Sequence, residues 1–328
     1  MFAKKMHKYE NEFRQIKDLI EKATNIAIIS HKNPDGDTIG ANLALTHALR
    51  SVGKNAISFA KDPAPAATGF LPGVSSIRSE LNPSEFDLFI ALDCGAAYMM
   101  KYEIEHPELL DRSQTTLINI DHHPSNEHFG NVNVVDPEAS ATSALIYFLI
   151  ESLGITISRD IATCLMNGLY SDTGSFKHSN TDPITLKIAS NLVARGADFR
   201  TIVKQQFHHN RINQLRLWGR VLSRSRINDK GATISAVMEK DFDELGATPE
   251  DLSGVIDYIN SVPDSKFCIL LAEDQKGNIK GSFRTQDDMI DLSKIAGLFG
   301  GGGHKKAAGF TIPGKIEQEV VWKIKPAA

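Results

Sequence analysis

Five short apolar runs in the N-terminal half of the sequence constrain the fold most. They cover residues 25–30, 55–60, 87–93, 115–121 and 132–135. The runs are continuous rather than alternating, which is typical of strands buried on both faces of a parallel sheet. Apolar residues at helical spacing occupy residues 9–24, 140–154, 158–170 and 183–195. The sequence therefore predicts an α/β domain with a doubly wound, mostly parallel five-stranded sheet.

The C-terminal part has its own pattern of elements. Strand-like runs cover residues 232–238, 267–272 and 279–284, and helical patterns cover 249–260 and 292–298. We expect a smaller α/β domain here, with a cleft between it and the first. The predicted division is a metal-binding domain at 1–190, a basic helical linker at 191–228 and a substrate-binding domain at 229–328. Because charge runs usually face water, the linker is interpreted as a solvated helix.

The composition is that of a soluble intracellular protein. Hydrophobic residues make up 41% of 328 residues, which is enough for a large core. The three cysteines, Cys94, Cys164 and Cys268, are widely spaced and odd in number, which argues against a disulfide framework and a cysteine-rich zinc site. The N-terminal residues lack the apolar core of a signal peptide, and no apolar run approaches the ~18 residues of a membrane helix. We expect a cytoplasmic protein that does not enter a membrane.

Histidines and aspartates follow several of the predicted strands. In open parallel sheets the carboxyl ends of the strands meet at one edge, so these side chains are expected to lie close together. Carboxylate and imidazole together suit Mn²⁺ or a similar divalent cation. The proposed ligands lie in the segments H-K-N-P-D-G-D, A-L-D-C-G, D-H-H and S-D-T-G, and they are His31, Asp35, Asp37, Asp93, His122 and Asp172.

Simpler explanations exist for single members of this set. The segment N-P-D-G is a good β-turn, and turn chemistry alone could explain Asp35. It does not explain His31 and Asp37, which flank the turn between a buried strand and a predicted helix. The segment D-T-G also marks aspartic proteases, but those enzymes need two such aspartates in a β-rich fold, and this chain has one D-T-G.

Taken in order, the motifs resemble those of the DHH phosphoesterase family. They read H-K-N-P-D-G-D, A-L-D-C-G, I-D-H-H-P and S-D-T-G-S-F, and they span the first domain. The resemblance implies two divalent ions, Mn²⁺ or alternatively Mg²⁺ or Co²⁺, which share a water and lower its pKa for in-line attack on phosphorus. One ion would be held by His31, Asp35 and Asp93, and the other by four residues: Asp37, Asp93, His122 and Asp172. Asp121 would orient a ligand histidine, and His123 would contact phosphate or protonate the leaving oxygen.

The second domain carries the segment G-G-G-G-H-K-K-A-A-G-F at residues 300–310. A flexible loop is the simple interpretation of a glycine run. Alternatively, glycines allow close backbone approach, and a helix that starts here would point N–H groups at an anion. The segment looks like the G-G-G-H motif of the DHH-associated domain, and S-F-R-T looks like that domain's substrate-contacting strand. The implied substrate contacts are Arg284, Gly301, Gly302, Gly303, His304 and Lys305.

Charge and length indicate the substrate class. The formal charge of -4 would be neutralised by two divalent ions, and a neutral protein lacks the basic excess of a binder of long nucleic acid. The two-domain length resembles the NrnA-type nanoRNases, which hydrolyse oligoribonucleotides of about two to five nucleotides and dephosphorylate 3'-phosphoadenosine 5'-phosphate (pAp). A linear or cyclic dinucleotide phosphodiesterase and a RecJ-like single-strand exonuclease stay open as alternatives. So do a catalytically inactive nucleotide-binding regulatory module and a homodimeric assembly.

Overall fold

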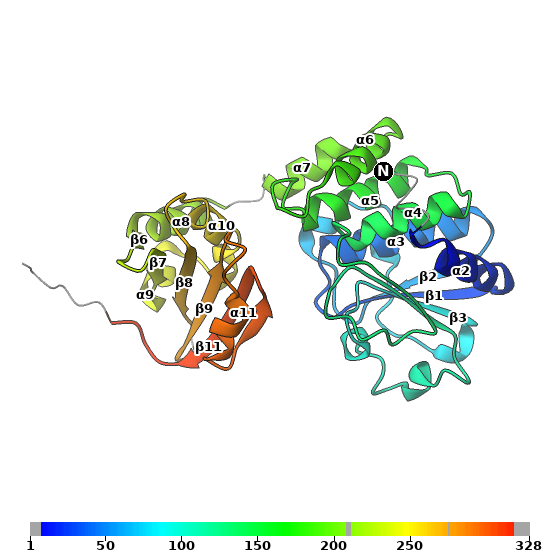
Figure 1. The fold of residues 1–328 in the computed structure, drawn as a ribbon, viewed down its shortest axis with the longest axis horizontal. Helices are drawn as coiled ribbons and strands as arrows, with labels where there is room; N and C mark the ends of the chain where they lie inside the picture. Colours follow the sequence, from blue (N-terminus) through cyan, green and yellow to red (C-terminus); the bar gives the residue numbers. More distant parts are fainter. Residues whose placement is uncertain (1–7, 208–210, 275, 318–328) are drawn as a thin grey trace, which may run out of the picture. The chain divides into compact units, whose positions relative to one another are not determined.

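The chain folds into two compact units, Met1–His209 and Asn210–Ala328. The structure is a computed structural model that describes residues 8–207, 211–274 and 276–317. Each unit has its own sheet and hydrophobic core (Figure 1). Among the described residues, no helix combines the length and the apolar character needed to cross a membrane. The predicted cleft between the domains stays a prediction.

The first unit is built on a sheet of parallel strands. In chain order these are β1 (Asn25–Ser30), β2 (Asn55–Phe59), β3 (Leu88–Leu92), β4 (Leu117–Asp121) and β5 (Val132–Val135). Their spatial order is β2-β1-β3-β4-β5, and every pairing is parallel. The predicted five-stranded α/β sheet is therefore confirmed. The connection reverses direction between β1 and β3, the position at which doubly wound sheets bind ligands.

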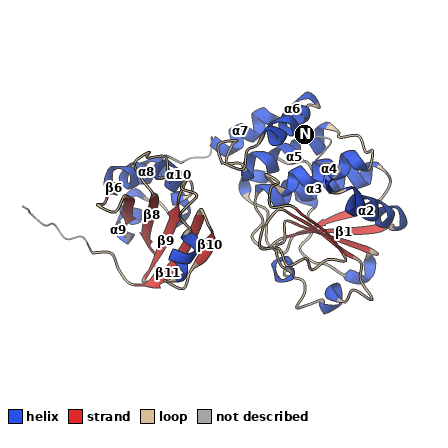
Figure 2. Ribbon diagram, viewed as in Figure 1, coloured by secondary structure: helices blue, strands red, loops and turns tan. Residues whose placement is uncertain are grey.

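Both faces of this sheet are buried, as the continuous apolar runs predicted. In β1, Ile26 and Ile28 belong to one core cluster, and Ala27 and Ile29 belong to the other. The helices α3 to α6 lie together on one face of the sheet (Figure 2). The helices of this unit are α2 (Glu10–Lys22), α3 (Gly36–Ser51), α4 (Thr142–Ser152), α5 (Arg159–Asp172), α6 (Pro183–Ala194) and α7 (Phe199–Phe207). Several short 3-10 turns, including Ala97–Met100, join the strands.

Two glycines allow α3 and α5 to cross at very short distance. A Cβ atom on Gly40 would lie 2.5 Å from the carbonyl oxygen of Cys164 and 3.0 Å from the backbone nitrogen of Gly168. A Cβ atom on Gly168 would lie 2.6 Å from Oδ1 of Asp37. The crossing therefore places Asp37, in the first turn of α3, against α5, which ends at Asp172.

The second unit contains a mixed sheet of order β10-β11-β9-β8-β7-β6. Its strands are β6 (Arg226–Ile227), β7 (Ala232–Val237), β8 (Phe267–Glu273), β9 (Asn278–Arg284), β10 (Gly302–His304) and β11 (Ala307–Pro313). Only β7 and β8 pair in parallel among these described strands. The helices are α8 (Ile212–Arg224), α9 (Glu239–Leu245), α10 (Val255–Ile259) and α11 (Leu292–Gly297). The smaller α/β domain is confirmed, and the sequence had not predicted α9, β6, β10 or β11.

The basic stretch forms two helices that belong to different units. Ile202 of α7 is buried in the core of the first unit, whereas Leu217 and Val221 of α8 are buried in the core of the second. The arginines of α8 are partly neutralised, because Arg220 and Arg224 both donate to the buried Asp241. The compact units thus divide between α7 and α8. The domain limits at residues 190 and 228 stay predictions.

Alanine substitutions at two helical glycines should change the free energy of unfolding in opposite directions. Gly40→Ala should destabilise the first unit by about 1–3 kcal/mol, because the added methyl meets backbone atoms that cannot yield. Gly219→Ala in α8 should stabilise the second unit by about 0.5–1 kcal/mol, because a Cβ atom there meets nothing within 4 Å. Urea titration read by hydrogen-exchange mass spectrometry separates the two units. A stabilising Gly40→Ala would show that the close crossing is not required.

Candidate metal centre

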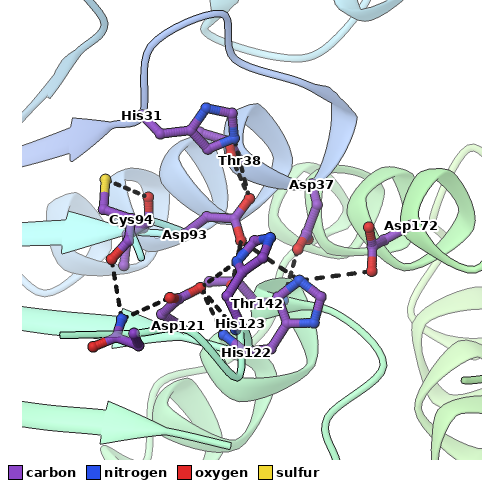
Figure 3. A network of polar contacts seen from close by, with 12 residues as sticks. His31, Asp37, Thr38, Asp93, Cys94, Asp121, His122, His123, Thr142 and Asp172 are labelled. Atoms are coloured by element: carbon purple, nitrogen blue, oxygen red, sulfur yellow. Dashed lines mark hydrogen bonds and ion pairs between the residues drawn. The ribbon is translucent and has the colours of Figure 1, made fainter. Parts of the chain in front are cut away.

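The side chains predicted as ligands gather beyond the carboxyl ends of the strands, and Figure 3 shows five of them: His31, Asp37, Asp93, His122 and Asp172. His31 follows β1, Asp93 follows β3, and His122 follows β4. Asp35 is the N-cap of α3, and its carboxylate accepts from the backbone nitrogens of Asp37 and Thr38. The turn explanation and the ligand explanation of Asp35 are therefore compatible, because one carboxylate oxygen caps the helix and leaves the other available.

Asp93 lies at the middle of the cluster and is 1% exposed. Its backbone adopts a left-handed conformation with φ of 60°, which is uncommon for a residue other than glycine. Thr38 Oγ1 donates to one carboxylate oxygen, and Thr142 Oγ1 donates to the other at 2.9 Å. Two histidines approach from opposite sides, with His31 Nε2 3.4 Å from Oδ2 and His122 Nε2 3.7 Å from Oδ1.

The backbone fixes the tautomers of both histidines. Nδ1 of His31 lies 2.6 Å from the carbonyl oxygen of Lys32, and Nδ1 of His122 lies 3.3 Å from that of Ala139. A carbonyl oxygen can only accept, so each Nδ1 carries a proton and donates it. In both residues Nε2 faces Asp93, where it donates to the carboxylate when it is protonated and offers its lone pair to a metal ion when it is deprotonated. This is the arrangement of a metal-ligating histidine.

The carboxylates of the cluster repel one another. Burial, followed by the charges of Asp93 and Asp172, raises the pKa of Asp37 well above its ordinary value. Burial also raises the pKa of Asp172 to about 6. Burial would raise the pKa of Asp93 as well, but the hydrogen bond from His31 and the charges of the neighbouring histidines lower it below its ordinary value. A bound cation would relieve this repulsion.

Asp121 and His123 form a closely bonded pair beside the cluster. His123 Nδ1 lies 2.7 Å from Asp121 Oδ1 and 3.6 Å from Asp93 Oδ1. The hydrogen bond to Asp121 raises the pKa of His123 to about 9. Asp121 is fully buried and accepts further hydrogen bonds from the backbone nitrogen of His122 and from Asn126. The ring of His123 is therefore held in place by Asp121, and its raised pKa favours the protonated form.

Among the described residues, two groups have ligand atoms close enough to hold an ion. His31, Asp35 and Asp93 form one group, and within each group the ligand atoms lie within 4.8 Å of one another. Asp93 also belongs to the second group, with His122 and His123. His122 in turn lies 3.7 Å from Asp172. The carboxylates and the imidazoles of His31 and His122 therefore fit a divalent metal ion, with Asp93 common to both groups, whereas Nδ1 of His123 is bonded to Asp121.

Sequence reasoning missed the residues that hold these carboxylates. Thr142 and Ser143 begin α4, and their backbone nitrogens donate to Asp37 at 2.6 Å and 3.0 Å. A helix N-terminus stabilises a nearby anion, which explains how a buried Asp37 is tolerated. Thr38 directly follows the proposed ligand Asp37, so its position in the sequence could have indicated that it contacts a ligand carboxylate. No sequence pattern connects Thr142 with Asp93, which is 49 positions away.

The glycine run of the second unit does not begin a helix, so that expectation was wrong. The run follows α11, and its last residues form β10, which pairs with β11. A Cβ atom on Gly301 would lie 2.1 Å from the carbonyl oxygen of Gly309, so the close approach of two chain segments requires glycine here. Gly302 and Gly303 pair with β11, and Lys305 lies in the turn between the two strands.

Arg284 and His304 share a row of this sheet. Both residues are register partners of Ala307, Arg284 from β9 and His304 from β10. Directly opposed residues of antiparallel strands point to the same face, so these two side chains lie on one face with a small residue between them. Arg284 also forms an ion pair with Asp257, with Nε 3.7 Å from Oδ1.

Comparison with known proteins agrees with this geometry. A family model described as the DHH family N-terminal domain matches residues 25–169, and one described as the DHHA1 domain matches residues 229–325. The bifunctional oligoribonuclease and PAP phosphatase NrnA of Thermus thermophilus is 31% identical over 94% of this chain and 90% of its own. The protein of the same name from Bacillus subtilis is 24% identical over 88% and 89%.

Solved structures show the same fold. An exopolyphosphatase-related protein from Bacteroides fragilis has 27% identity and a TM-score of 0.82, covering 95% of this chain and 92% of that one. The exonuclease RecJ bound to manganese has 16% identity and a TM-score of 0.53, covering 92% and 90%. The extent of these matches, together with both domain models, shows that the chain belongs to the DHH family.

Proposed function

We propose that this chain is a metal-dependent phosphoesterase that hydrolyses short oligoribonucleotides and removes phosphate from pAp. The observation that carries the proposal is the buried Asp93, approached from two sides by histidines whose Nε2 atoms face it. The Thermus thermophilus relative is named for both activities and matches nearly the whole chain. The alternative of an inactive binding module has no support in the site, since every proposed ligand is present.

The proposed ligands are His31, Asp35 and Asp93 for one ion and Asp37, Asp93, His122 and Asp172 for another, with Mn²⁺ as the cation that the donor set suits. When bound, such ions supply an activated water and stabilise charge on phosphorus. Asp121 holds His123 through the 2.7 Å hydrogen bond. Because the pKa of His123 is raised to about 9, its ring can donate a proton to the leaving oxygen or to a phosphate oxygen at neutral pH.

We assign substrate contacts in the second unit to the row that contains Arg284 and His304. Their common face and the small Ala307 between them leave room for an anionic group. Lys305 and the glycines 301–303 adjoin this row and complete the proposed contact. A guanidinium and an imidazole can form charge-assisted hydrogen bonds with phosphate. The Asp257 carboxylate competes for Arg284 until a phosphate replaces it.

Two further properties belong to the proposal. The three cysteines are free thiols buried in the protein, which suits the reducing cytoplasm. The homodimer and the preference for RNA over DNA are predictions without a structural test.

Asp93→Asn should abolish hydrolysis. The change keeps the shape of the side chain but removes the charge common to both ligand groups, so kcat should fall by roughly three orders of magnitude or more. The assay compares pAp, a dinucleotide and a long RNA in the presence of Mn²⁺, with products resolved by chromatography. Asp18→Asn, which changes an exposed carboxylate of α2, is the matched control and should behave as wild type. Near-normal turnover by folded Asp93→Asn, or preference of the wild type for the long RNA, would contradict the proposal.

Asp172→Asn should change metal-free and metal-bound stability in opposite directions. The pKa of Asp172 rises from 3.8 to about 6 on folding, so ionising this carboxyl destabilises the fold as the pH rises through that window. At about pH 7, metal-free Asp172→Asn should therefore melt above metal-free wild type. Mn²⁺ at 100 times its Kd should stabilise wild type by about 2.7 kcal/mol, and the variant by less. Calorimetric melting after EDTA treatment measures both. An equal gain from Mn²⁺ in the two proteins would exclude Asp172 as a ligand.

Arg284→Ala and His304→Ala should weaken substrate capture and leave metal binding unchanged. Each loses charge-assisted hydrogen bonds to phosphate, at a cost of about 1.5–3 kcal/mol in kcat/KM. Steady-state kinetics on pAp should be measured beside a calorimetric Mn²⁺ titration. Lys280→Ala is the control, because Lys280 is a cation on the same strand, four positions away. Altered metal stoichiometry in either variant, or unchanged kinetics in both, would show that this row does not bind substrate.

A further inference from the structure

Two loops of the first unit meet beside the metal centre through Lys32 and Tyr98. Lys32 follows the proposed ligand His31, and its backbone nitrogen donates to the carbonyl oxygen of Met99 at 2.6 Å. Its ammonium lies over the ring of Tyr98, 4.3 Å from the ring centroid. Tyr98 belongs to the 3-10 turn Ala97–Met100, shortly after Asp93. The pair is therefore attached at both ends to segments that supply ligands.

Two lysines near this pair form close ion pairs, whereas Lys32 acts on the Asp62 carboxylate only from beyond ion-pair distance. Lys101 forms an ion pair with Asp62 at 2.9 Å, and Lys61 forms one with Glu105 at 2.8 Å. Among the described residues, no carboxylate oxygen lies within 4.0 Å of the Lys32 ammonium. Asp62 also accepts from the backbone nitrogen of Asn33 at 2.8 Å, which holds the loop that carries Lys32. A fixed loop thus presents a positive charge that no carboxylate of the described residues approaches within 4.0 Å.

Tyr98 presents an aromatic ring at the same position. The residue is 57% exposed, and Lys32 covers one part of its ring. An exposed tyrosine often has no role beyond covering a loop. Here, however, the ring lies next to the Lys32 ammonium, which forms no close ion pair with a described carboxylate, and a few residues from a proposed bridging ligand. A planar base that stacks on the ring and a phosphate that meets the ammonium are the two parts of a nucleotide.

We propose that Tyr98 and Lys32 form a nucleotide-binding contact at the rim of the metal centre. The base of the substrate stacks on Tyr98, and Lys32 meets a phosphate other than the one that is cleaved. This inference rests on the proposed function and deepens it, because it assigns recognition of the nucleoside to the unit that holds the metal ligands. It also supplies a reason for short substrates, since one base and one further phosphate already occupy the pair.

Tyr98→Ala should reduce the preference for a substrate that carries a base over one that lacks it. The test compares kcat/KM for pAp with that for ribose 3',5'-bisphosphate, which has both phosphates and no base. The ratio should fall about tenfold in Tyr98→Ala, mainly through KM, and should be retained in Tyr98→Phe, which keeps the ring. An unchanged ratio in Tyr98→Ala, or a Tyr98→Phe that behaves like Tyr98→Ala, would overturn the stacking role.

Lys32→Gln should weaken recognition of the second phosphate of the substrate, which is the one that is not cleaved. The preference for pAp over adenosine 3'-phosphate should fall several-fold, whereas Lys187→Gln, on the exposed side of α6, should retain it. A calorimetric measurement of the affinities of wild type and Tyr98→Ala for adenosine 5'-phosphate and ribose 5-phosphate tests the role of Tyr98 without turnover. If the wild type hydrolyses no substrate but still prefers the nucleotide through Tyr98, the proposed function fails and this inference stands. Equal binding of both ligands by wild type and Tyr98→Ala would overturn the inference alone.

Discussion

The burial of the Asp93 carboxylate is the constraint on which the first unit depends. A buried charge is very costly unless other groups satisfy it. Here the satisfying groups come from several distant segments: the hydroxyls of Thr38 and Thr142, and the ring of His31. Each of these segments follows a strand or begins a helix at the same edge of the sheet. The need to satisfy one carboxylate therefore fixes the loop after β1, the N-terminus of α3 and the N-terminus of α4 around it.

Helix packing brings the remaining carboxylates to the same place. Gly40 and Gly168 let α3 and α5 approach until Asp37 lies against the backbone of α5. The N-terminus of α4 then donates two backbone hydrogen bonds to Asp37. This arrangement tolerates the negative charge but does not remove the repulsion, which is visible in the raised pKa values of Asp37 and Asp172. An arrangement that retains such repulsion in its metal-free form is suited to binding a cation.

The second unit illustrates how glycine can be misinterpreted. The run at residues 300–303 suggested either a flexible loop or a close backbone approach at an anion-binding helix N-terminus. The close approach is present, since Gly301 and Gly303 lie against the backbone of β11, but it serves a strand pairing and not a helix. That packing pairs His304 with Ala307, and Ala307 pairs with Arg284. The helix N-terminus expected at this run was therefore wrong, and the assignment of Arg284 and His304 to the substrate stays a prediction.

The sequence by itself determined the strands of the first sheet, the set of polar residues at their ends and the presence of a second α/β domain. These are local properties, because an apolar run, a turn or a motif is complete within a few residues. Only the tertiary structure decided which oxygen faces which nitrogen, that Thr142 supports Asp93, and that Lys32 covers Tyr98. Thr142 and Asp93 are 49 positions apart in the sequence, and Lys32 and Tyr98 are 66 positions apart. Their existence depends on strand order and on the distance between packed helices, which the pattern of any single segment does not contain.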